Sequence, residues 1–356
     1  MGKSIQGAGG ALVLGTVFKS IVTRTQQSPR ESSRFPEQWL KECFIELQNV
    51  FVSFDGSMLA SAVIGLVDDE NGFLYYINAE HPWPVLYRKG KASFLGVDES
   101  LRKIGIEGLE GRLRISTLKL EEQDVIITGS DGKDDIVIGE DAEGQRIINE
   151  DETIFLRLVE QHRGMLDGIE KALTARGELT DDLSLLRIGY CEDIIAPAPD
   201  LSNGGRGQLI AEGKKALREN RTNEAISFFE KALEAGPQDA NLLRYLSKHY
   251  LKTKNFEKAA PYCESYCEIR PESEDFLFAS SYAFKHLGDF ARAADFGERL
   301  RLRNPSNARN LANLADIHRL SGNNKRAEMI AIEALSVDPD NILAAKITER
   351  IRGENI

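Results

Sequence analysis

Residues 120–132 read LEEQDVIITGSDG, and residues 180–190 read TDDLSLLRIGY. In each segment a strand-like apolar run adjoins a short acidic turn, which carries Asp131 in the first case and Asp181 in the second. Carboxylates fixed at strand ends suit hard cations such as Mg²⁺ or Mn²⁺. An aspartate in a turn is also a common turn former, so either motif alone is weak evidence for a metal site.

The surrounding residues predict a mixed domain. Alternating apolar residues indicate strands at 59–67, 73–78, 84–88, 112–118, 125–128 and 183–190. Helical spacing indicates helices at 11–23 and 36–52 and one long helix at 152–175. The run DDENG at 68–72 predicts a hairpin loop, and a third polar turn, NAEHPWP at 78–84, follows the second strand. The pattern predicts an α+β domain with mostly antiparallel pairing.

Four segments in a fixed order resemble the PPM (metal-dependent, type 2C) protein phosphatases. They are GKSIQGAGGALVLGTVF at 2–18, YYINAEHPWPVLYR at 75–88, and the two segments quoted above. The similarity is closest to the bacterial regulatory branch typified by SpoIIE and RsbU. That branch has a GK/GH-x-x-x-A helix start, an N-A-G-H-P-P turn, a G-D-x-(apolar)-T-D-G turn and a D-D-x-T/S strand start. The resemblance covers about residues 1–190 and implies an antiparallel β-sandwich flanked by helices.

The resemblance also assigns roles to single residues. Asp131 matches the metal-binding aspartate of T-D-G, and Asp181 matches that of D-D-x-T. Residues that it places near the site are Gly132, Asp182, Asn78 and His81. The family uses two Mn²⁺ or Mg²⁺ ions to activate a water for attack on a phosphomonoester. No cysteine of this chain lies in a motif for thiolate catalysis.

The chain departs from the family pattern at two places. Glu80 stands where the family has glycine. The family also has D-x-x-G-K/H before its first helix, and that aspartate bridges the two metals. If Gly2 is the glycine of this motif, the aspartate belongs two residues before Met1. The first strands of the family's sheets would also precede Met1, and their loss would leave sheet edges unpaired. We expect Met1 to be an internal methionine of a longer protein, because Asp131 and Asp181 are retained; a degenerate form is the alternative.

Composition excludes several classes of protein. The chain has 356 residues, enough for two domains, with 42% apolar and 28% charged residues. No apolar run is long enough for a transmembrane helix, and the Gly/Ala-rich start lacks the features of a secretory signal. The four scattered cysteines indicate neither a disulfide framework nor a zinc module. We expect a reduced, cytoplasmic protein with no membrane partner.

Charge divides the chain into two halves. The net charge is −11; residues 1–205 hold 21 Lys/Arg and 34 Asp/Glu, whereas residues 206–356 hold 24 and 22. Such an acidic first half is unsuited to binding nucleic acid. The linker-like sequence APAPDLSNGGRG at 196–207 separates the halves. We expect a phosphatase domain at 1–194, a linker at 195–205 and a second domain at 206–356.

The second half contains a repeat of 34 residues. Prolines at 237, 271, 305 and 339 define units 206–239, 240–273, 274–307 and 308–341. Position 20 is alanine in every unit, position 8 is small in every unit, and position 15 suits a tight turn in all units except at Lys254. The pattern resembles tetratricopeptide repeats and implies an all-α solenoid, with residues 342–352 as a capping helix.

One stripe of the first helix of each unit lines the concave groove in that repeat family. Positions 2, 5, 9, 12 and 13 of this stripe are rich in cations. Residues of this predicted partner-binding groove are Lys214, Arg218, Arg244, Lys248, Lys252, Phe278, Tyr282, Arg309 and Arg319, with Lys285 and His286 on the same stripe. Asp275 and Asp316 oppose this charge. The stripe indicates a groove for an acidic protein or peptide, or for the acidic first half itself; a merely solvated face is the alternative.

Together these patterns indicate a serine/threonine protein phosphatase fused to four tetratricopeptide repeats. By resemblance, its substrate would be a phosphorylated regulatory protein of the anti-sigma-antagonist type. The competing hypothesis is a catalytically inactive, phosphatase-like adaptor whose repeats bind partner proteins.

Overall fold

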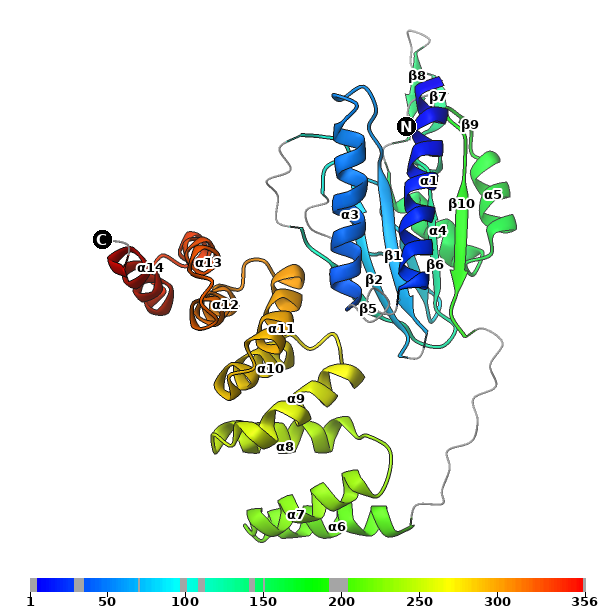
Figure 1. Ribbon diagram of the computed structural model, residues 1–356. Coiled ribbons are helices and arrows are strands. Elements are labelled where there is room, and N and C mark those ends of the chain that lie inside the picture. The colour runs from blue at the N-terminus through cyan, green and yellow to red at the C-terminus, as the bar shows by residue number, and fades with distance from the viewer. Residues whose placement is uncertain are drawn as a thin grey trace. The chain divides into compact units, whose positions relative to one another are not determined.

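A computed structural model describes residues 5–28, 35–69, 71–96, 101–107, 113–140, 145–149, 151–191 and 204–354 (Figure 1). The chain divides into two compact units, Met1–Ile195 and Ala196–Ile356. The first unit combines helices with β-sheets, and the second is helical, which confirms the predicted fold classes. Residue 112 of a predicted strand and most of the predicted linker lie outside the described residues.

The described residues of the first unit form three antiparallel sheets. One has the order β1 (Ala62–Asp68), β2 (Phe73–Ala79), β5 (Ser116–Lys119). The next has the order β10 (Leu185–Gly189), β6 (Val125–Gly129), β3 (Val85–Arg88), β4 (Lys91–Phe94). A small sheet has the order β8 (Arg146–Ile148), β7 (Ile136–Glu140), β9 (Glu178–Leu179). The predicted hairpin pairs β1 with β2, with Asp68 opposite Phe73.

The α-helices in the described residues of this unit are α1 (Ile5–Gln27), α3 (Pro36–Val52), α4 (Thr153–Gln161) and α5 (Leu166–Thr174). The predicted helix 36–52 has the same bounds in the structure and begins at a proline, whose fixed φ favours the first helical position. The prediction of one helix at 152–175 was wrong. Arg163 and Gly164 both have positive φ, 52° and 70°, and this turn separates α4 from α5.

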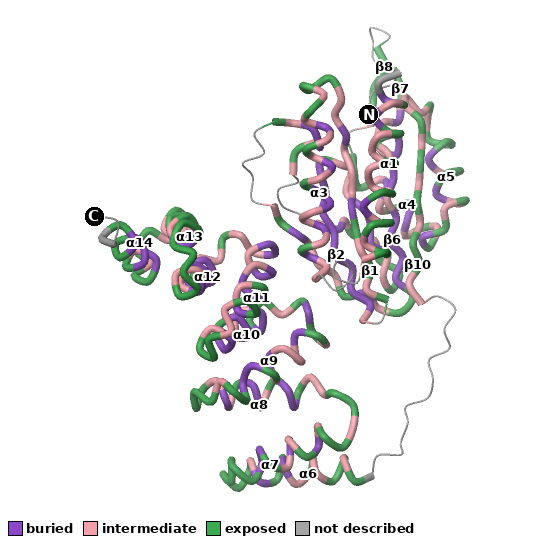
Figure 2. The backbone as a smooth tube through the Cα atoms, viewed as in Figure 1, coloured by how far each residue is buried: buried purple, intermediate pink, exposed green. Residues whose placement is uncertain are grey.

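The two larger sheets pack face to face. Leu74 and Tyr76 of β2 join Leu86 of β3 and Ile126 of β6 in one buried apolar cluster. Every residue of β2 is buried because α3 packs against β1 and β2 on the other face (Figure 2). On the outer face of the second sheet, strands β3 and β6 pack against α4 and α5 through residues that include Val85, Val125, Ile127, Phe155 and Leu173.

The core of this sandwich is incompletely filled near β1 and β10. Each is the outer strand of its sheet in the described part of the chain. An apolar cavity of about 410 Å³ lies there, lined by β1, β2, β6, β10 and residues of α1 such as Phe18. Leu186 and Ile188 of β10 line it and remain 57% and 43% exposed.

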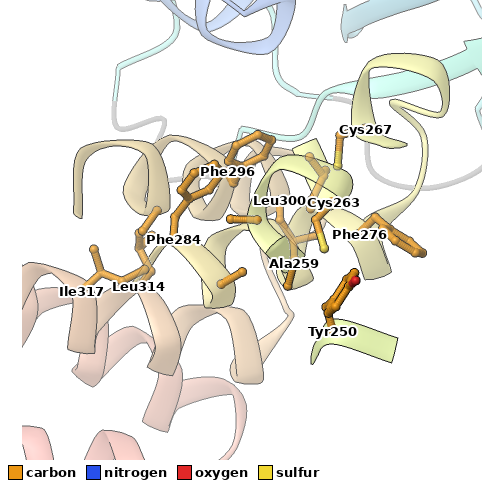
Figure 3. Close-up of a cluster of buried hydrophobic side chains, with 14 of the residues drawn as sticks. Tyr250, Ala259, Cys263, Cys267, Phe276, Phe284, Phe296, Leu300, Leu314 and Ile317 are labelled. Carbon is orange, nitrogen blue, oxygen red and sulfur yellow. The ribbon is translucent and has the colours of Figure 1, made fainter. Parts of the chain in front are cut away.

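The second unit is a series of helix pairs. The pairs are α6 (Gly204–Arg218) with α7 (Thr222–Glu234), α8 (Ala240–Lys252) with α9 (Phe256–Ile269), α10 (Glu274–Leu287) with α11 (Phe290–Arg303), and α12 (Ala308–Leu320) with α13 (Asn324–Val337). A last helix, α14 (Ile342–Glu354), packs on α12 and α13. Buried side chains from successive pairs form one continuous core (Figure 3).

Small residues let the paired helices approach closely. The alanines at position 20, which are Ala225, Ala259, Ala293 and Ala327, are all fully buried. A Cβ atom at Gly213, position 8 of the first unit, would lie 2.4 Å from Cε1 of Phe229. The position-15 residues Asn220, Lys254, Gly288 and Gly322 all adopt positive φ. Lys254 therefore adopts the turn conformation that its residue type disfavours.

Replacing Lys254 with glycine should stabilise the repeats by about 1 kcal/mol, because glycine adopts a φ of 57° without steric cost. The side chain of Lys254 is exposed, so little packing is lost. Urea unfolding followed by far-UV circular dichroism measures the change. As a control, Lys248→Gly changes an exposed residue inside α8 and should destabilise the repeats. A stability loss in Lys254→Gly would contradict this account of the turn.

A polar network links the first two repeats. One carboxylate oxygen of Glu230 accepts hydrogen bonds from Tyr250 at 2.7 Å, Lys258 at 2.9 Å and Tyr262 at 3.3 Å. Burial by itself would raise the pKa of Glu230, but the hydrogen bonds from Lys258 and Tyr250 outweigh it and lower the pKa. Burial and the charge of Glu230 raise the pKa of Tyr262 to about 12.

The network predicts a pH dependence of stability. Because folding lowers the pKa of Glu230, its stabilisation is fully present above the ordinary value of 4.5 and is lost as the pH falls through the lowered folded pKa. Glu230→Gln should therefore be less stable than wild type at pH 7, and this difference should shrink below pH 4.5. Thermal unfolding across pH measures it, with the exposed Glu234→Gln as control. A difference that is independent of pH would contradict the role of this carboxylate charge.

Candidate metal centre

The turn that carries Asp131 follows the buried strand β6. Asp131 begins a short 3₁₀ helix, Asp131–Lys133, and its carbonyl accepts hydrogen bonds from the amides of Asp134 at 2.8 Å and Asp135 at 3.1 Å. The Asp131 side chain is exposed. A Cβ atom at Gly132 would lie 2.7 Å from the carbonyl oxygen of Asp182, so this position requires glycine.

The second acidic motif lies directly beside the first. Strand β10 pairs antiparallel with β6, and Leu185 is opposite Gly129. The Ser130 hydroxyl donates to the carbonyl of Asp182 at 2.8 Å and accepts from the amide of Ser184 at 3.0 Å. The Asp182 amide in turn donates to the carboxylate of Asp181 at 2.7 Å. The structure thus brings Asp131 and Asp181 to turns at adjoining ends of the paired strands β6 and β10.

The third motif reaches the same place. Asn78, at the end of β2, is only 7% exposed. Its side-chain oxygen accepts a hydrogen bond from the backbone N–H of His81 at 2.8 Å, and its side-chain NH₂ group donates one to the His81 carbonyl at 2.9 Å. This turn places the His81 ring 3.4 Å from the Ser61 hydroxyl. Burial lowers the pKa of His81, while the charge of Asp131 and a hydrogen bond with the Gly129 backbone oppose that effect. Glu80, where the family has glycine, adopts a φ of 47°.

Lys133 is a site residue that the sequence analysis missed. Its side chain is 2% exposed, forms an ion pair with Asp134, and places the ammonium 4.9 Å from the ring centroid of Phe155. Burial raises the pKa of Asp134, although Lys133 opposes this. The run DGKDD resembles a solvated turn, and only the fold reveals that its lysine points into the core.

The donor set suits a hard cation but is small. Asp131 and Asp181 offer carboxylate oxygens, which Mg²⁺ and Mn²⁺ prefer. Among the residues that the structure describes, no group of three or more His, Cys, Asp or Glu side chains is arranged to hold a metal ion.

Comparison with protein families agrees with this geometry. A family model described as Stage II sporulation protein E (SpoIIE) matches residues 1–190. The chain belongs to the SpoIIE family. Tetratricopeptide-repeat models match residues 210–274 and 308–341. A SpoIIE phosphatase-family domain is therefore followed by tetratricopeptide repeats.

Solved structures similar to the chain include tetratricopeptide-repeat proteins. YrrB, "a TPR protein with an unusual peptide-binding site", is 20% identical, with a TM-score of 0.36, over 42% of this chain and 76% of its own. MamA is 18% identical, with a TM-score of 0.37, over 42% of this chain and 82% of its own. The first tetratricopeptide-repeat domain of Spaghetti, bound to an HSP90 peptide, is 17% identical, with a TM-score of 0.31, over 34% of this chain and 95% of its own. No curated protein matches the chain.

The groove residues predicted from the sequence lie on four helices. Lys214 and Arg218 are on α6, Arg244, Lys248 and Lys252 on α8, Phe278 and Tyr282 on α10, and Arg309 and Arg319 on α12. The charge is less evenly spread than the sequence suggests. Asp316 pairs with Lys285 at 3.1 Å and with Arg319 at 2.6 Å, so its single negative charge offsets half of the positive charge of these two cations.

No described helix has both the length and the apolar character needed to span a membrane.

Proposed function

We propose that the first unit is a metal-dependent phosphoserine/phosphothreonine protein phosphatase. The observation that supports this most directly is the meeting of three separate motifs, in which Asp131, Asp181 and His81 come from three different strand ends of a SpoIIE-family domain. Asp131 and Asp181 would hold Mn²⁺ or Mg²⁺. Such ions, when bound, lower the pKa of a coordinated water and screen phosphate charge.

The chain's own residues would orient this site. The Ser130 hydroxyl bridges Asp182 and Ser184 and so fixes the two aspartate turns to each other. The close approach at Gly132 keeps the turns in contact. The Asn78 amide locks the His81 turn beside them. Because Asp131 is exposed, a phosphorylated side chain on another protein can reach the site.

The proposed substrate is a phosphorylated cytoplasmic regulatory protein of the anti-sigma-antagonist type, and the repeats would hold an acidic protein partner. A second candidate function is an inactive adaptor that only recruits partners. The scarcity of metal donors among the described residues favours that alternative.

Hydrolysis of a phosphoserine peptide in the presence of Mn²⁺ separates the two functions. We expect residues 1–356 alone to show little turnover, and a chain that includes the residues encoded upstream of Met1 to be active. If the extended chain binds Mn²⁺ in calorimetry yet hydrolyses no phosphopeptide, the adaptor is the better description.

The proposed acidic partner can be tested by charge reversal. Arg244 and Lys248 are exposed on α8. Arg244→Glu combined with Lys248→Glu should weaken binding of a labelled polyglutamate peptide, and more so at low salt, because exposed charges are screened beyond about 8 Å at physiological ionic strength. Fluorescence anisotropy across salt measures this, with Lys325→Glu and Lys346→Glu together as the matched control. Unchanged binding at low salt would mean that the groove charge is merely solvated.

A further inference from the structure

A row of aromatic rings runs along α10. Phe278, Tyr282 and His286 are spaced one helical turn apart; the first two ring centroids are 6.2 Å apart and the next two 4.4 Å. Phe256 of the preceding helix pair stacks on His286 at 4.4 Å. The ring of Tyr282 is 36% exposed, so the row presents an apolar aromatic surface.

Phe278 and Tyr282 of this row line a cavity of about 370 Å³. Lys248 and Leu251 of α8, Phe278 and Tyr282 of α10, and Arg309 of α12 line it. The Arg309 guanidinium lies 4.1 Å from the centroid of the Phe278 ring, a cation–π contact that orders both side chains. The cavity falls within the size range of ligand pockets and is built from three successive repeats.

Charge is distributed unequally around this cavity. On the α12 side, Asp316 forms ion pairs with both Lys285 and Arg319 and offsets part of their positive charge. On the α8 side, Arg244, Lys248 and Lys252 share one helix face at i, i+4 spacing. All three are exposed and have no ion-pair partner among the residues that the structure describes. Lys248 belongs both to this cationic face of α8 and to the lining of the cavity.

Carboxylates limit the position that an acidic ligand can occupy. Glu274 and Asp275, in the first turn of α10, also line the cavity. A ligand carboxylate is repelled there and attracted over α8 and α6, where Lys214 and Arg218 repeat the positions of Lys248 and Lys252 one unit earlier. An uncharged ring suits the cavity itself.

We propose that the groove binds one extended peptide through two adjoining parts, a single aromatic side chain in the α10 cavity and acidic residues directly beside it over α8 and α6. This inference rests on the proposed role of the repeats in holding an acidic partner and specifies what that partner must contain. An acidic segment without the ring, or a ring without the acidic segment, makes only half of the contacts.

The test uses the 356-residue chain and fluorescein-labelled synthetic peptides. Two peptides carry four glutamates with one tryptophan, placed before them in one and after them in the other. Matched peptides replace tryptophan with alanine, or the glutamates with glutamines. We expect the better of the two tryptophan peptides to bind about tenfold more tightly than either of its matched variants.

Protein variants should show that the two parts act at different places. Tyr282→Ala should abolish the preference for tryptophan over alanine and keep the preference for glutamate. Arg244→Glu with Lys252→Glu, two exposed cations of α8 that do not line the cavity, should abolish the preference for glutamate and keep the preference for tryptophan. Lys346→Glu, an exposed cation of α14, serves as the control. Circular dichroism verifies that each variant is folded.

The outcomes separate this inference from the broader proposal. Equal binding of the tryptophan and alanine peptides, or an unchanged tryptophan preference in Tyr282→Ala, overturns the two-part site and leaves acidic binding intact. If no acidic peptide binds at all, the proposed acidic partner is wrong as well. Neither result bears on the phosphatase activity of the first unit, which is assayed separately.

Discussion

Asp131→Asn should reduce Mn²⁺-dependent hydrolysis of a phosphoserine peptide by roughly a thousandfold or more, because it removes a ligand charge from the centre of the reaction. Asparagine has nearly the same size and keeps the backbone hydrogen bonds of the turn, so the fold should survive. The assay uses a chain that includes the residues upstream of Met1, where the resemblance places the bridging aspartate. Calorimetric titration with Mn²⁺ gives a second readout, in which binding should weaken.

The matched control is Asp69→Asn, which makes the same chemical change at an exposed position after β1. This variant should keep full activity. Normal turnover and normal Mn²⁺ affinity in a folded Asp131→Asn would show that the metal is held by other residues. Strong turnover by residues 1–356 without any extension would show that the family motif has been aligned wrongly at the amino terminus.

The repeat unit was the part of the fold best predicted from the sequence, because the same packing requirements apply at the same positions of every unit. A buried alanine at position 20 and a small residue at position 8 are required wherever two helices touch, so they recur every 34 residues. Lys254 shows the limit of that argument. Its residue type gave no sign of a left-handed turn, but the neighbouring helix packing imposes a φ of 57° on it.

The break between α4 and α5 was missed because the apolar pattern continues across it. Phe155 and Leu158 before the break and Ile169 and Leu173 after it are buried in the same cluster. A periodic apolar face therefore suggested one helix, although Gly164 with a φ of 70° ends the first. Strands β4, β7, β8 and β9 were missed for a different reason, since they are short and mostly exposed and depend on their partners.

The order of the motifs along the chain identified the candidate site, and the pairing of the strands explains why the motifs lie close together. The resemblance selected Asp131 and Asp181, but their adjacency follows from the register of β6 with β10. No local signal indicated that the Ser130 hydroxyl would bridge the two turns, or that Lys133 would be buried. Both facts depend on contacts between segments about 50 residues apart or with the core, which single-residue patterns do not encode.

A buried ion pair between Arg88 and Asp124 should make the largest single contribution of a charged pair to the stability of the first unit. Asp124 is 1% exposed and accepts two hydrogen bonds from Arg88, at 2.8 Å and 2.5 Å. Its carboxylate also accepts from the amide of Glu121 at 2.8 Å, and Arg88 donates to the carbonyl of Lys119 at 2.8 Å. The pair thus ties β3 to the connection between β5 and β6.

Asp124→Ala should destabilise this unit by about 3 kcal/mol, because it removes the buried carboxylate that accepts two hydrogen bonds from Arg88 and leaves the Glu121 amide without that acceptor. Both tryptophans, Trp39 and Trp83, lie in the first unit, so urea unfolding followed by tryptophan fluorescence reports on this unit alone. Glu121→Gln removes a 42%-exposed partner of the same arginine and should cost at most about 1 kcal/mol. Equal effects from the two variants would mean that burial adds nothing to this pair. In that case the desolvation of Asp124 already offsets its hydrogen bonds, and the β3 connection is held by its apolar neighbours alone.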